Sequence, residues 1–360
     1  MSILNAATVG CGRMGAFHSL SIETHAPPFW MPISHLGAIN SLDEVVAVAC
    51  CDLSKDQLTR AQEKFDVPHG YDDYKELLEN HSIDLLTIAT RTPQKAQIIL
   101  DALTAGVRAI HVEKPLCNTA AELAQLEQAI LDSGAWVTYG CLRPLLPPYR
   151  QALAHSQTPE FGPLVDIHVE MGKEPLMWSM VHALNLLVFF ADRAKPVQVQ
   201  AWFDYLEINP AHPHTVLNDP KFHSATVLFE TGLTGRIGHA GGHAVTLSSE
   251  AARIEVFANG LNMFASVVPD GGVYQERHPI EISPSTSPGG TAAALSLLQR
   301  ALHGDAVAQT LAYDTTQDML RTQHLIFDMV QSHLNGGTVV ASQSYADNTA
   351  VMGFTDGRPA

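Results

Sequence analysis

The stretch Val9-Gly10-Cys11-Gly12-Arg13-Met14-Gly15 carries the pattern GxGxxG at the end of an apolar run, residues 4–10, that has the composition of a buried strand. In this position the first glycine makes a tight turn, the second lets a pyrophosphate approach the backbone, and the third lets the next helix pack on the strand. The helix start adds N–H groups and the positive end of its dipole. The stretch predicts dinucleotide binding; a glycine-rich turn without a ligand is the alternative.

Short apolar runs alternate with helical patterns as far as about residue 142. The expected strands are residues 4–10, 45–51, 83–89, 107–112 and 136–140. Apolar residues at helical spacing predict helices over residues 54–65, 74–79, 93–105 and 119–132. Repeated strand–helix–strand units predict an α/β domain with a doubly wound parallel sheet.

The pattern changes after Arg143 to strands that follow one another with few helices, which is typical of an α+β domain. The expected strands are residues 164–171, 197–206, 225–230, 234–239, 253–258 and 262–268. Helices are expected over residues 176–191, 292–302 and 315–334. Residues 209–220 and 269–290 are rich in Pro, Gly, His and Asp, and we expect surface loops there.

Asp52 stands at the end of the second expected strand, where an acidic residue binds the adenosine ribose in dinucleotide-binding units. Its carboxylate accepts both ribose hydroxyls and repels a 2′-phosphate, which favours NAD over NADP. From Gly15 to Asp52 is 37 positions, where about 20 is usual. About seventeen residues are therefore extra, and three prolines place the insert at about residues 20–35. It either lies near the cofactor or is a surface excursion or subunit contact.

Composition excludes several classes of protein. The 360 residues are 46% hydrophobic, and 21 basic against 37 acidic residues give a net charge of −16. This charge disfavours nucleic acid and anionic membranes as partners. Five cysteines without a CxxC pair indicate reduced thiols. With no recognisable signal peptide or long apolar span, we expect a cytoplasmic protein.

Val112-Glu113-Lys114-Pro115-Leu116, at the end of the fifth expected strand, contains the motif EKP. Together with GxGxxG it resembles the family of glucose-fructose oxidoreductase, inositol dehydrogenase and MocA (Gfo/Idh/MocA). The resemblance extends to AVACCD, IDLLTIAT, LDALTAGVRAIHVEKPL, the segment from Gly140 to Arg143, FGPLV at 161–165 and VHALNLL at 181–187. It implies a Rossmann domain over residues 1–142. Residues 143–360 would form a substrate-binding domain with a large, mostly antiparallel open sheet. Helix 315–334 would pack back on the first domain.

The resemblance also implies roles for individual residues. Lys114 lies beside the nicotinamide and exchanges the substrate proton, its bond to Pro115 is often cis, and His182 assists as the second catalytic group. Thr90, Glu113 and Arg143 lie on the nicotinamide side, while Gly10, Gly12, Arg13, Met14 and Gly15 bind the pyrophosphate. A lysine near a positive ring and partly desolvated loses its proton more easily, which suits this role. A small-molecule substrate and a homodimer or homotetramer formed through the C-terminal sheet are implied as well.

Two departures from the family pattern bear on the substrate. Trp178 stands where the family has an Asp, and Asn185 where some members have a second acid, so the predicted substrate site is more apolar. Arg91 and Lys95, with Lys114 and Arg143, are predicted to form a cationic site, which favours an acidic or phosphorylated substrate. By the resemblance we expect an oxidoreductase that moves a hydride between NAD, or less favourably NADP, and a secondary alcohol or ketone of a sugar, cyclitol or related polyhydroxylated molecule.

The sequence is also consistent with two other functions, and its histidine pairs raise the question of a metal site. A glycosidase that retains NAD and a non-catalytic ligand sensor occur on the same scaffold, and the missing Asp keeps the sensor open. His239 and His243 are expected on a strand, where four residues span about 13 Å, too far for one ion. His212 and His214 lie in an expected loop without a Cys or carboxylate partner. We predict no metal.

Overall fold

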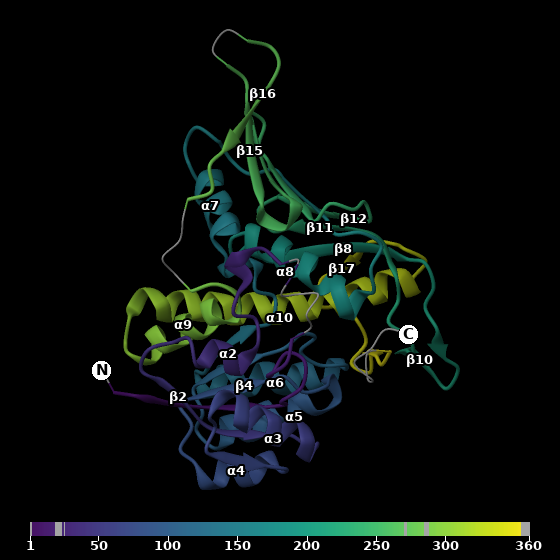
Figure 1. The fold of residues 1–360 in the computed structure, drawn as a ribbon. Helices are drawn as coiled ribbons and strands as arrows, with labels where there is room; N and C mark the ends of the chain where they lie inside the picture. Colours follow the sequence, from purple (N-terminus) through teal and green to yellow (C-terminus); the bar gives the residue numbers. More distant parts are fainter. Residues whose placement is uncertain (1, 19–23, 25, 270–271, 284–287, 354–360) are drawn as a thin grey trace. The chain divides into compact units, whose positions relative to one another are not determined.

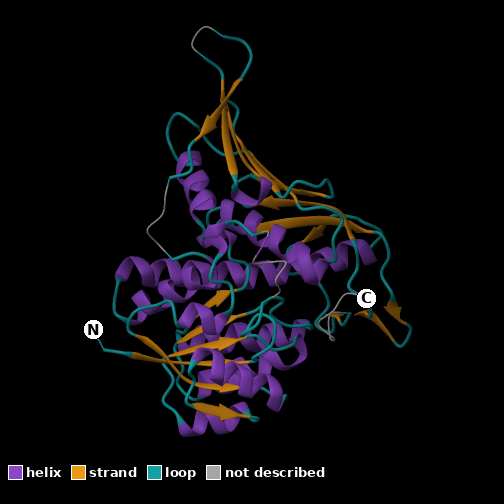
Figure 2. Cartoon of the chain, in the orientation of Figure 1, coloured by secondary structure: helices purple, strands orange, loops and turns teal. Residues whose placement is uncertain are grey.

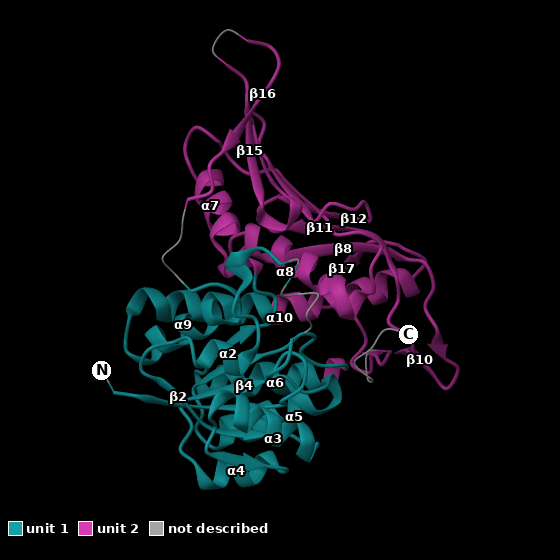
Figure 3. Ribbon diagram, in the orientation of Figure 1, with its two compact units in different colours: residues 1–118, 122–142, 287–319 teal, residues 119–121, 143–286, 320–360 magenta. Residues whose placement is uncertain are grey.

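The computed structural model describes residues 2–353 apart from 19–23, 25, 270–271 and 284–287, and it divides the chain into two compact units (Figure 3). Unit 1 comprises residues 1–118, 122–142 and 287–319, and unit 2 comprises residues 119–121, 143–286 and 320–360. Residues 287–319 thus belong with the N-terminal unit, whereas the expected division assigns them to the second domain. The division falls inside one long helix, α10 (Ala306–Leu334).

Unit 1 is built on a six-stranded parallel sheet with helices packed around it (Figures 1 and 2). Its strands, in spatial order, are β3 (His69–Tyr71), β2 (Val45–Cys51), β1 (Leu4–Val9), β4 (Leu85–Ile88), β5 (Ala109–Val112) and β6 (Trp136–Tyr139). Five of these were expected, and the sixth, β3, is a short, largely exposed edge strand. The strand order reverses between β1 and β4, and in such sheets ligands bind at this reversal, beyond the carboxyl ends of the strands.

Two helices of unit 1 begin at side chains that cap them. Ser54 accepts a hydrogen bond from the Gln57 N–H at the start of α3, and Asp73 accepts one from the Lys75 N–H at the start of α4. The helices are α2 (His35–Ile39), α3 (Lys55–Phe65), α4 (Tyr74–Asn80), α5 (Thr92–Thr104), α6 (Ala120–Ser133) and α9 (Gly290–Leu302), with the short helix η1 (Pro28–Trp30). Helix α9 packs on α2 and on β5 and β6.

The insert interrupts the first helix without changing its phase. The Ala16 N–H donates to the Gly12 carbonyl, and the His35 and Leu36 N–H groups donate to the carbonyls of Met14 and Gly15, each at 2.9 Å. A helical bond spans four positions, and His35 follows Met14 by 21, so seventeen residues, 18–34, are inserted. This begins slightly earlier than expected, and residues 19–23 and 25 lie outside the described part.

The later part of the insert is folded into unit 1. Trp30 and Ile33 are buried, and the Thr291 N–H and hydroxyl donate to the carbonyls of Pro32 and Ile33 at 3.0 and 2.6 Å. A side chain on Gly290 would collide with the Trp30 carbonyl, which explains a glycine at the start of α9. Within the described residues, the insert therefore contributes to the core of unit 1 instead of forming only a surface excursion.

Unit 2 contains a nine-stranded, mostly antiparallel sheet, as expected (Figures 1 and 2). Its strands, in spatial order, are β16 (Glu276–Ile280), β15 (Asn262–Val267), β14 (Ala252–Phe257), β13 (Ala244–Ser248), β7 (Asp166–Glu170), β12 (Thr234–Gly238), β11 (Phe222–Phe229), β8 (Pro196–Phe203) and β17 (Val340–Ala341). Helix α8 (Val181–Phe190) packs on β7 and β12. A side chain on Gly235 would come within 2.6 Å of Leu187, so this glycine lets the helix approach the sheet.

The two segments expected to be loops contain strands. A small sheet is formed by β18 (Ala350–Val351), β10 (His212–Val216) and β9 (Ile208–Asn209), and β16 lies in the second segment. The loop assignments for residues 209–220 and 269–290 are therefore wrong in part. The remaining elements of unit 2 are η2 (Arg143–Leu145), α7 (Pro147–Ser156), η3 (Leu176–Met180) and η4 (Ala258–Gly260).

Two further expectations concern the chain as a whole. All five cysteines are buried and free, as predicted. Among the described residues, no helix combines the length and apolar character needed to cross a bilayer.

Candidate functional site

The glycines of the loop after β1 take the positions that dinucleotide binding requires. Gly10 has φ +93°, and a side chain there would come within 2.8 Å of the Ala89 carbonyl carbon. A side chain on Gly15 would overlap the Gly10 carbonyl oxygen. At Gly12 a Cβ would meet nothing closer than the Gln57 side chain, at 3.5 Å. The first and third glycines are thus required by packing, and the second leaves space over the loop for a phosphate group.

Asp52 connects this loop to the second strand. Its Oδ2 accepts a hydrogen bond from the Cys11 N–H at 2.7 Å, and its Oδ1 accepts one from the Ser54 N–H at 2.8 Å. Cys11 lies between the first two glycines and is fully buried, whereas Asp52 is half-buried. The carboxylate is therefore held at the carboxyl edge of the sheet, where a ribose can reach it.

Thr90 lies just after β4, next to the loop. The Thr90 N–H lies 2.9 Å from where a Cβ on Gly10 would stand, and its buried hydroxyl has no hydrogen-bond partner among the described residues. A buried hydroxyl without a partner is unfavourable unless a ligand completes it. The open space at Gly12, the carboxylate of Asp52 and this hydroxyl together fit a dinucleotide at the carboxyl edge of the sheet.

The EKP segment follows β5, two strands away from β1. The bond between Lys114 and Pro115 is cis, as the family resemblance implies. The Lys95 ammonium donates to the carbonyl oxygens of Glu113, Lys114 and Pro115 at 2.7, 3.0 and 2.9 Å. Lys95 is 1% exposed, and burial lowers its pKa to about 7. Its three donors are all used by the backbone, so the prediction that Lys95 belongs to a cationic substrate site is wrong.

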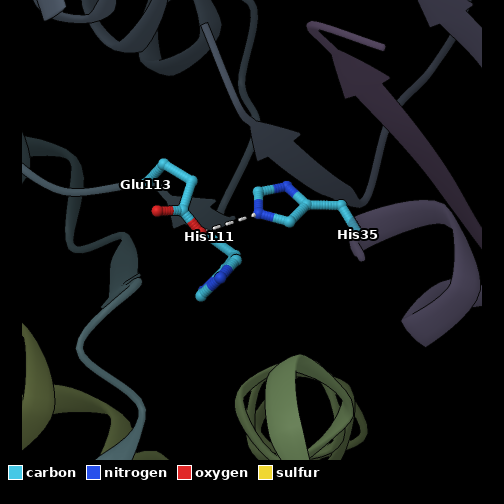
Figure 4. Close-up of side chains that lie close together, drawn as sticks. All are labelled: His35, His111 and Glu113. Carbon is cyan, nitrogen blue, oxygen red and sulfur yellow. Dashed lines mark hydrogen bonds and ion pairs between the residues drawn. The ribbon is translucent and has the colours of Figure 1, made fainter. Parts of the chain in front are cut away.

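The Glu113 side chain points away from solvent into a cluster with two buried histidines (Figure 4). His35 Nε2, from α2, lies 3.4 Å from Glu113 Oε1. His111, from β5, has its ring centre 5.0 Å from that of His35, and its Nδ1 lies 2.9 Å from the Thr138 hydroxyl. Neither His35 nor His111 was a candidate in the sequence.

The cluster holds Glu113 as a carboxylate. Burial raises the pKa of Glu113, but the hydrogen bond from His35 and the charges nearby outweigh burial and lower that pKa to about 2. Burial lowers the pKa of His111 to about 3, so this ring is neutral. A side chain on Gly140 would come within 2.7 Å of Glu113 Oε2, which explains a glycine at that position. Glu113 is 7% exposed and is directed inward.

His35, His111 and Glu113 are also a set that metals prefer, and their ligand atoms lie within 4.8 Å of one another. The surroundings argue against an ion. The Lys95 ammonium contacts the Glu113 carbonyl, and Lys114 is the adjacent residue. We therefore interpret the trio as a hydrogen-bonded cluster that surrounds a carboxylate.

Unit 2 contains the other predicted catalytic residue. His182 is half-buried at the start of α8, directly after the π-helical turn η3 that carries the half-buried Trp178. The Asp219 carboxylate accepts hydrogen bonds from the N–H groups of Met177 and Trp178, at 2.8 and 3.0 Å. An acid from a distant loop thus caps the turn that carries Trp178. The sequence contains no spacing signal that would have identified Asp219.

The other predicted residues are placed differently. Asn185 is 4% exposed and donates an amide N–H to the Thr322 hydroxyl at 3.2 Å, so it is a core contact of unit 2 and we do not retain it as a substrate residue. Arg143 is also buried, and its Nε donates to Asn259 Oδ1 at 2.9 Å within unit 2. Arg91 is exposed at the start of α5, and Arg13 is exposed on the glycine loop.

The fold and the loop geometry define a dinucleotide-binding Rossmann protein. Residues 4–141 match the family GFO_IDH_MocA, described as an oxidoreductase family with an NAD-binding Rossmann fold. The Rossmann region of the chain, residues 4–141, belongs to this Gfo/Idh/MocA oxidoreductase family.

Individual relatives are more distant. The mouse (Mus musculus) trans-1,2-dihydrobenzene-1,2-diol dehydrogenase is 33% identical over 27% of this chain and 28% of its own length. The chain aligns with only 27–31% of the length of the curated relatives it matches.

Two solved structures resemble nearly the whole fold. An oxidoreductase from Agrobacterium radiobacter, in complex with NAD+, L-tartaric acid and magnesium, has a TM-score of 0.69 at 15% identity and covers 94% of this chain and 98% of its own. Aldose-aldose oxidoreductase from Caulobacter crescentus, complexed with glycerol, has a TM-score of 0.72 at 17% identity and covers 94% and 99%. At these identities the likeness shows the fold.

Proposed function

We propose that the protein is an NAD-dependent dehydrogenase that oxidises a CH–OH group of a sugar, cyclitol or related diol, or reduces the corresponding ketone. The observation that carries the proposal is the placement of Lys114. It lies at the carboxyl end of β5, in the same sheet as the glycine loop, and Lys95 holds its backbone. The family match and the diol dehydrogenase relative support the reaction class.

The residues of this chain would divide the work between binding and proton transfer. When bound, the nicotinamide supplies the hydride chemistry. Gly10, Gly12 and Gly15, with the adjacent Arg13 and Met14, bind the pyrophosphate, and Asp52 accepts the adenosine ribose hydroxyls. Lys114 acts as the general base and takes the hydroxyl proton of the substrate. This role requires its amine to lie within hydrogen-bond distance of the substrate oxygen. His182, on unit 2, remains the predicted second group.

The nature of the substrate follows from fewer residues than the sequence suggested. Because the Lys95 ammonium binds three backbone carbonyls, the proposal of an acidic substrate depends on the other members of the predicted cationic site, Arg91, Lys114 and Arg143. Trp178 is half-buried and offers a flat apolar surface on which a sugar or diol ring can stack. A polyhydroxylated neutral substrate therefore fits the described residues as well as an acidic one.

We also propose a homodimer or homotetramer formed through the nine-stranded sheet. Large apolar side chains on three of its strands, Trp202, Phe257 and Val267, are 41–46% exposed. Burial of such groups against a second copy stabilises association. Sedimentation of the purified protein, and of a Trp202→Glu variant that shifts to monomer, tests this proposal.

The test of function is turnover at 340 nm with NAD and a panel containing sugars, sugar acids, cyclitols and trans-1,2-dihydrobenzene-1,2-diol. Lys114→Ala is expected to reduce kcat by at least about a hundredfold, the effect of losing a general base, while NADH fluorescence still shows cofactor binding. Turnover retained in this variant would rule out the role of Lys114. Glycoside hydrolysis without net NADH would favour the NAD-retaining glycosidase, and tight ligand binding without any turnover would favour the sensor.

A further inference from the structure

The contact between His35 and Glu113 joins two segments that the chain keeps apart. His35 is the first residue of α2, placed there because the insert preserves the phase of the interrupted helix, and Glu113 follows β5. His35 is fully buried, and its Nε2 faces Glu113 Oε1 at 3.4 Å (Figure 4). The residue at which the first helix resumes is therefore the one that touches the EKP motif.

Other groups hold Glu113 from the remaining directions. The Lys95 ammonium bonds its carbonyl oxygen at 2.7 Å and also bonds the next two carbonyls. Gly140, which lacks a side chain, leaves room for Oε2, which a Cβ would approach to 2.7 Å. The backbone and side chain of Glu113 are thus fixed by groups from α2, α5 and the end of β6, directly before Lys114.

We infer that His35 is a positioning residue for the Lys114 amine. The inference rests on the proposed function, because it assigns to Lys114 the proton transfer. Without the His35 donor, the buried Glu113 carboxylate must turn toward another donor or toward water, because burial of an unpaired charge is costly. Because Glu113 and Lys114 share a peptide bond, we expect that rotation to shift the backbone that carries the Lys114 side chain. Small displacements of a reacting group lower the rate of the chemical step more than they weaken binding.

His111 provides a matched control. It is as buried as His35 and belongs to the same cluster, but its Nδ1 contacts the Thr138 hydroxyl. A purely structural role would make the loss of either ring similarly harmful to catalysis. Positioning through Glu113 makes only the loss of His35 harmful to kcat.

The experiment compares His35→Leu, His35→Gln and His111→Leu with the wild type. In His35→Gln the amide can donate near the position of Nε2, so this variant tests rescue and also serves if His35→Leu folds poorly. We measure kcat and KM with the substrate found in the panel, the Kd for NADH by fluorescence, and zinc content by elemental analysis. The acetylation rate of Lys114 with acetic anhydride, relative to that of the exposed Lys75, reports on the amine without any substrate.

We expect His35→Leu to lower kcat about tenfold, with the Kd for NADH within about twofold of the wild type. It should change the Lys114 to Lys75 labelling ratio at least about threefold. His35→Gln should restore most of kcat and of the labelling ratio. His111→Leu should keep kcat and the labelling ratio within about twofold of the wild type. The inference is overturned if His35→Leu keeps the wild-type kcat and labelling ratio, or if His111→Leu impairs them equally. Stoichiometric zinc that both leucine variants lose would identify a metal site instead. Lys114→Ala, measured in parallel, shows separately whether the proposed function has failed.

Discussion

Replacing Asp52 by Asn should change the choice of cofactor. The Asp52 carboxylate is held by the N–H groups of Cys11 and Ser54, at 2.7 and 2.8 Å, so it cannot move away from a ligand without breaking these bonds. A 2′-phosphate carries about −1.5 to −2 charges. At about 5 Å and an effective dielectric constant of about 40, it would be repelled by about 2–3 kcal/mol. At 1.36 kcal/mol per tenfold, that energy corresponds to a preference for NAD over NADP of roughly 30- to 160-fold.

Fluorescence titration with NADH and NADPH measures this preference directly. In Asp52→Asn the repulsion is absent, so we expect the two affinities to differ by less than about threefold. NADH itself should bind about fivefold more weakly, because its ribose loses a charge-assisted acceptor. Asp56→Asn is the matched control, because Asp56 is 80% exposed on the same helix start. High salt should lower the ratio of NADH to NADPH affinity in the wild type and in Asp56→Asn, which both retain Asp52. It should leave this ratio unchanged in Asp52→Asn. Equal binding of NADH and NADPH by the wild type would refute the reasoning.

Three other substitutions test the packing and the buried charges. Gly15→Ala places a methyl on the Gly10 carbonyl, and we expect it to abolish NADH binding in fluorescence titrations. Burial raises the pKa of Asp328 to about 6, so the stability it contributes is present below about pH 4 and lost as the pH rises through 6. Because of Asp328, the free energy of unfolding measured with urea should fall by about 2–3 kcal/mol between pH 4 and 7. Asp328→Asn should abolish this fall. Burial lowers the pKa of Lys95 to about 7. The contribution of Lys95 to the free energy of unfolding is therefore fully present above about pH 10 and is lost as the pH falls through 7. Lys95→Met should remove this pH dependence of the free energy of unfolding between about pH 7 and 10. An unchanged pH dependence would contradict the lowered pKa of Lys95.

The sheet of unit 1 could be predicted because parallel strands are buried on both faces and appear in the sequence as continuous apolar runs. Residues 45–51 were assigned without error for this reason. The short strands β16, β10 and β3 could not be predicted from the sequence in this way. Strand β16 includes Pro279 and resembles a loop, because an edge strand needs fewer backbone donors. Strand β10 also contains a proline, Pro213, although it is the middle strand of the small three-stranded sheet. Strand β3 is only three residues long and largely exposed.

Some residues of the candidate site could likewise be predicted from the sequence, and others could not. The GxGxxG loop and Asp52 could be predicted because their geometry depends on residues close in sequence, and the sheet brings them together. The role of Lys95 could not, because a lysine on a helix carries no mark that its ammonium will be buried under a backbone turn 18–20 residues away. That Trp178 and Asn185 depart from the family pattern stays a prediction. Only the structure shows that Asn185 faces the core.

His35 is the instructive case, because the signal for it was present but incomplete. The spacing from Gly15 to Asp52 gave the size of the insert, seventeen residues, but not where it begins. Once the backbone bonds from His35 and Leu36 to Met14 and Gly15 fix that point, removing residues 18–34 places His35 four positions after Met14. A loop whose ends meet inside one helical turn needs little change elsewhere, so the chain can lengthen there while the helix keeps its direction. The backbone hydrogen bonds to Met14 and Gly15, and not the number of residues in the loop, therefore place His35 opposite Glu113.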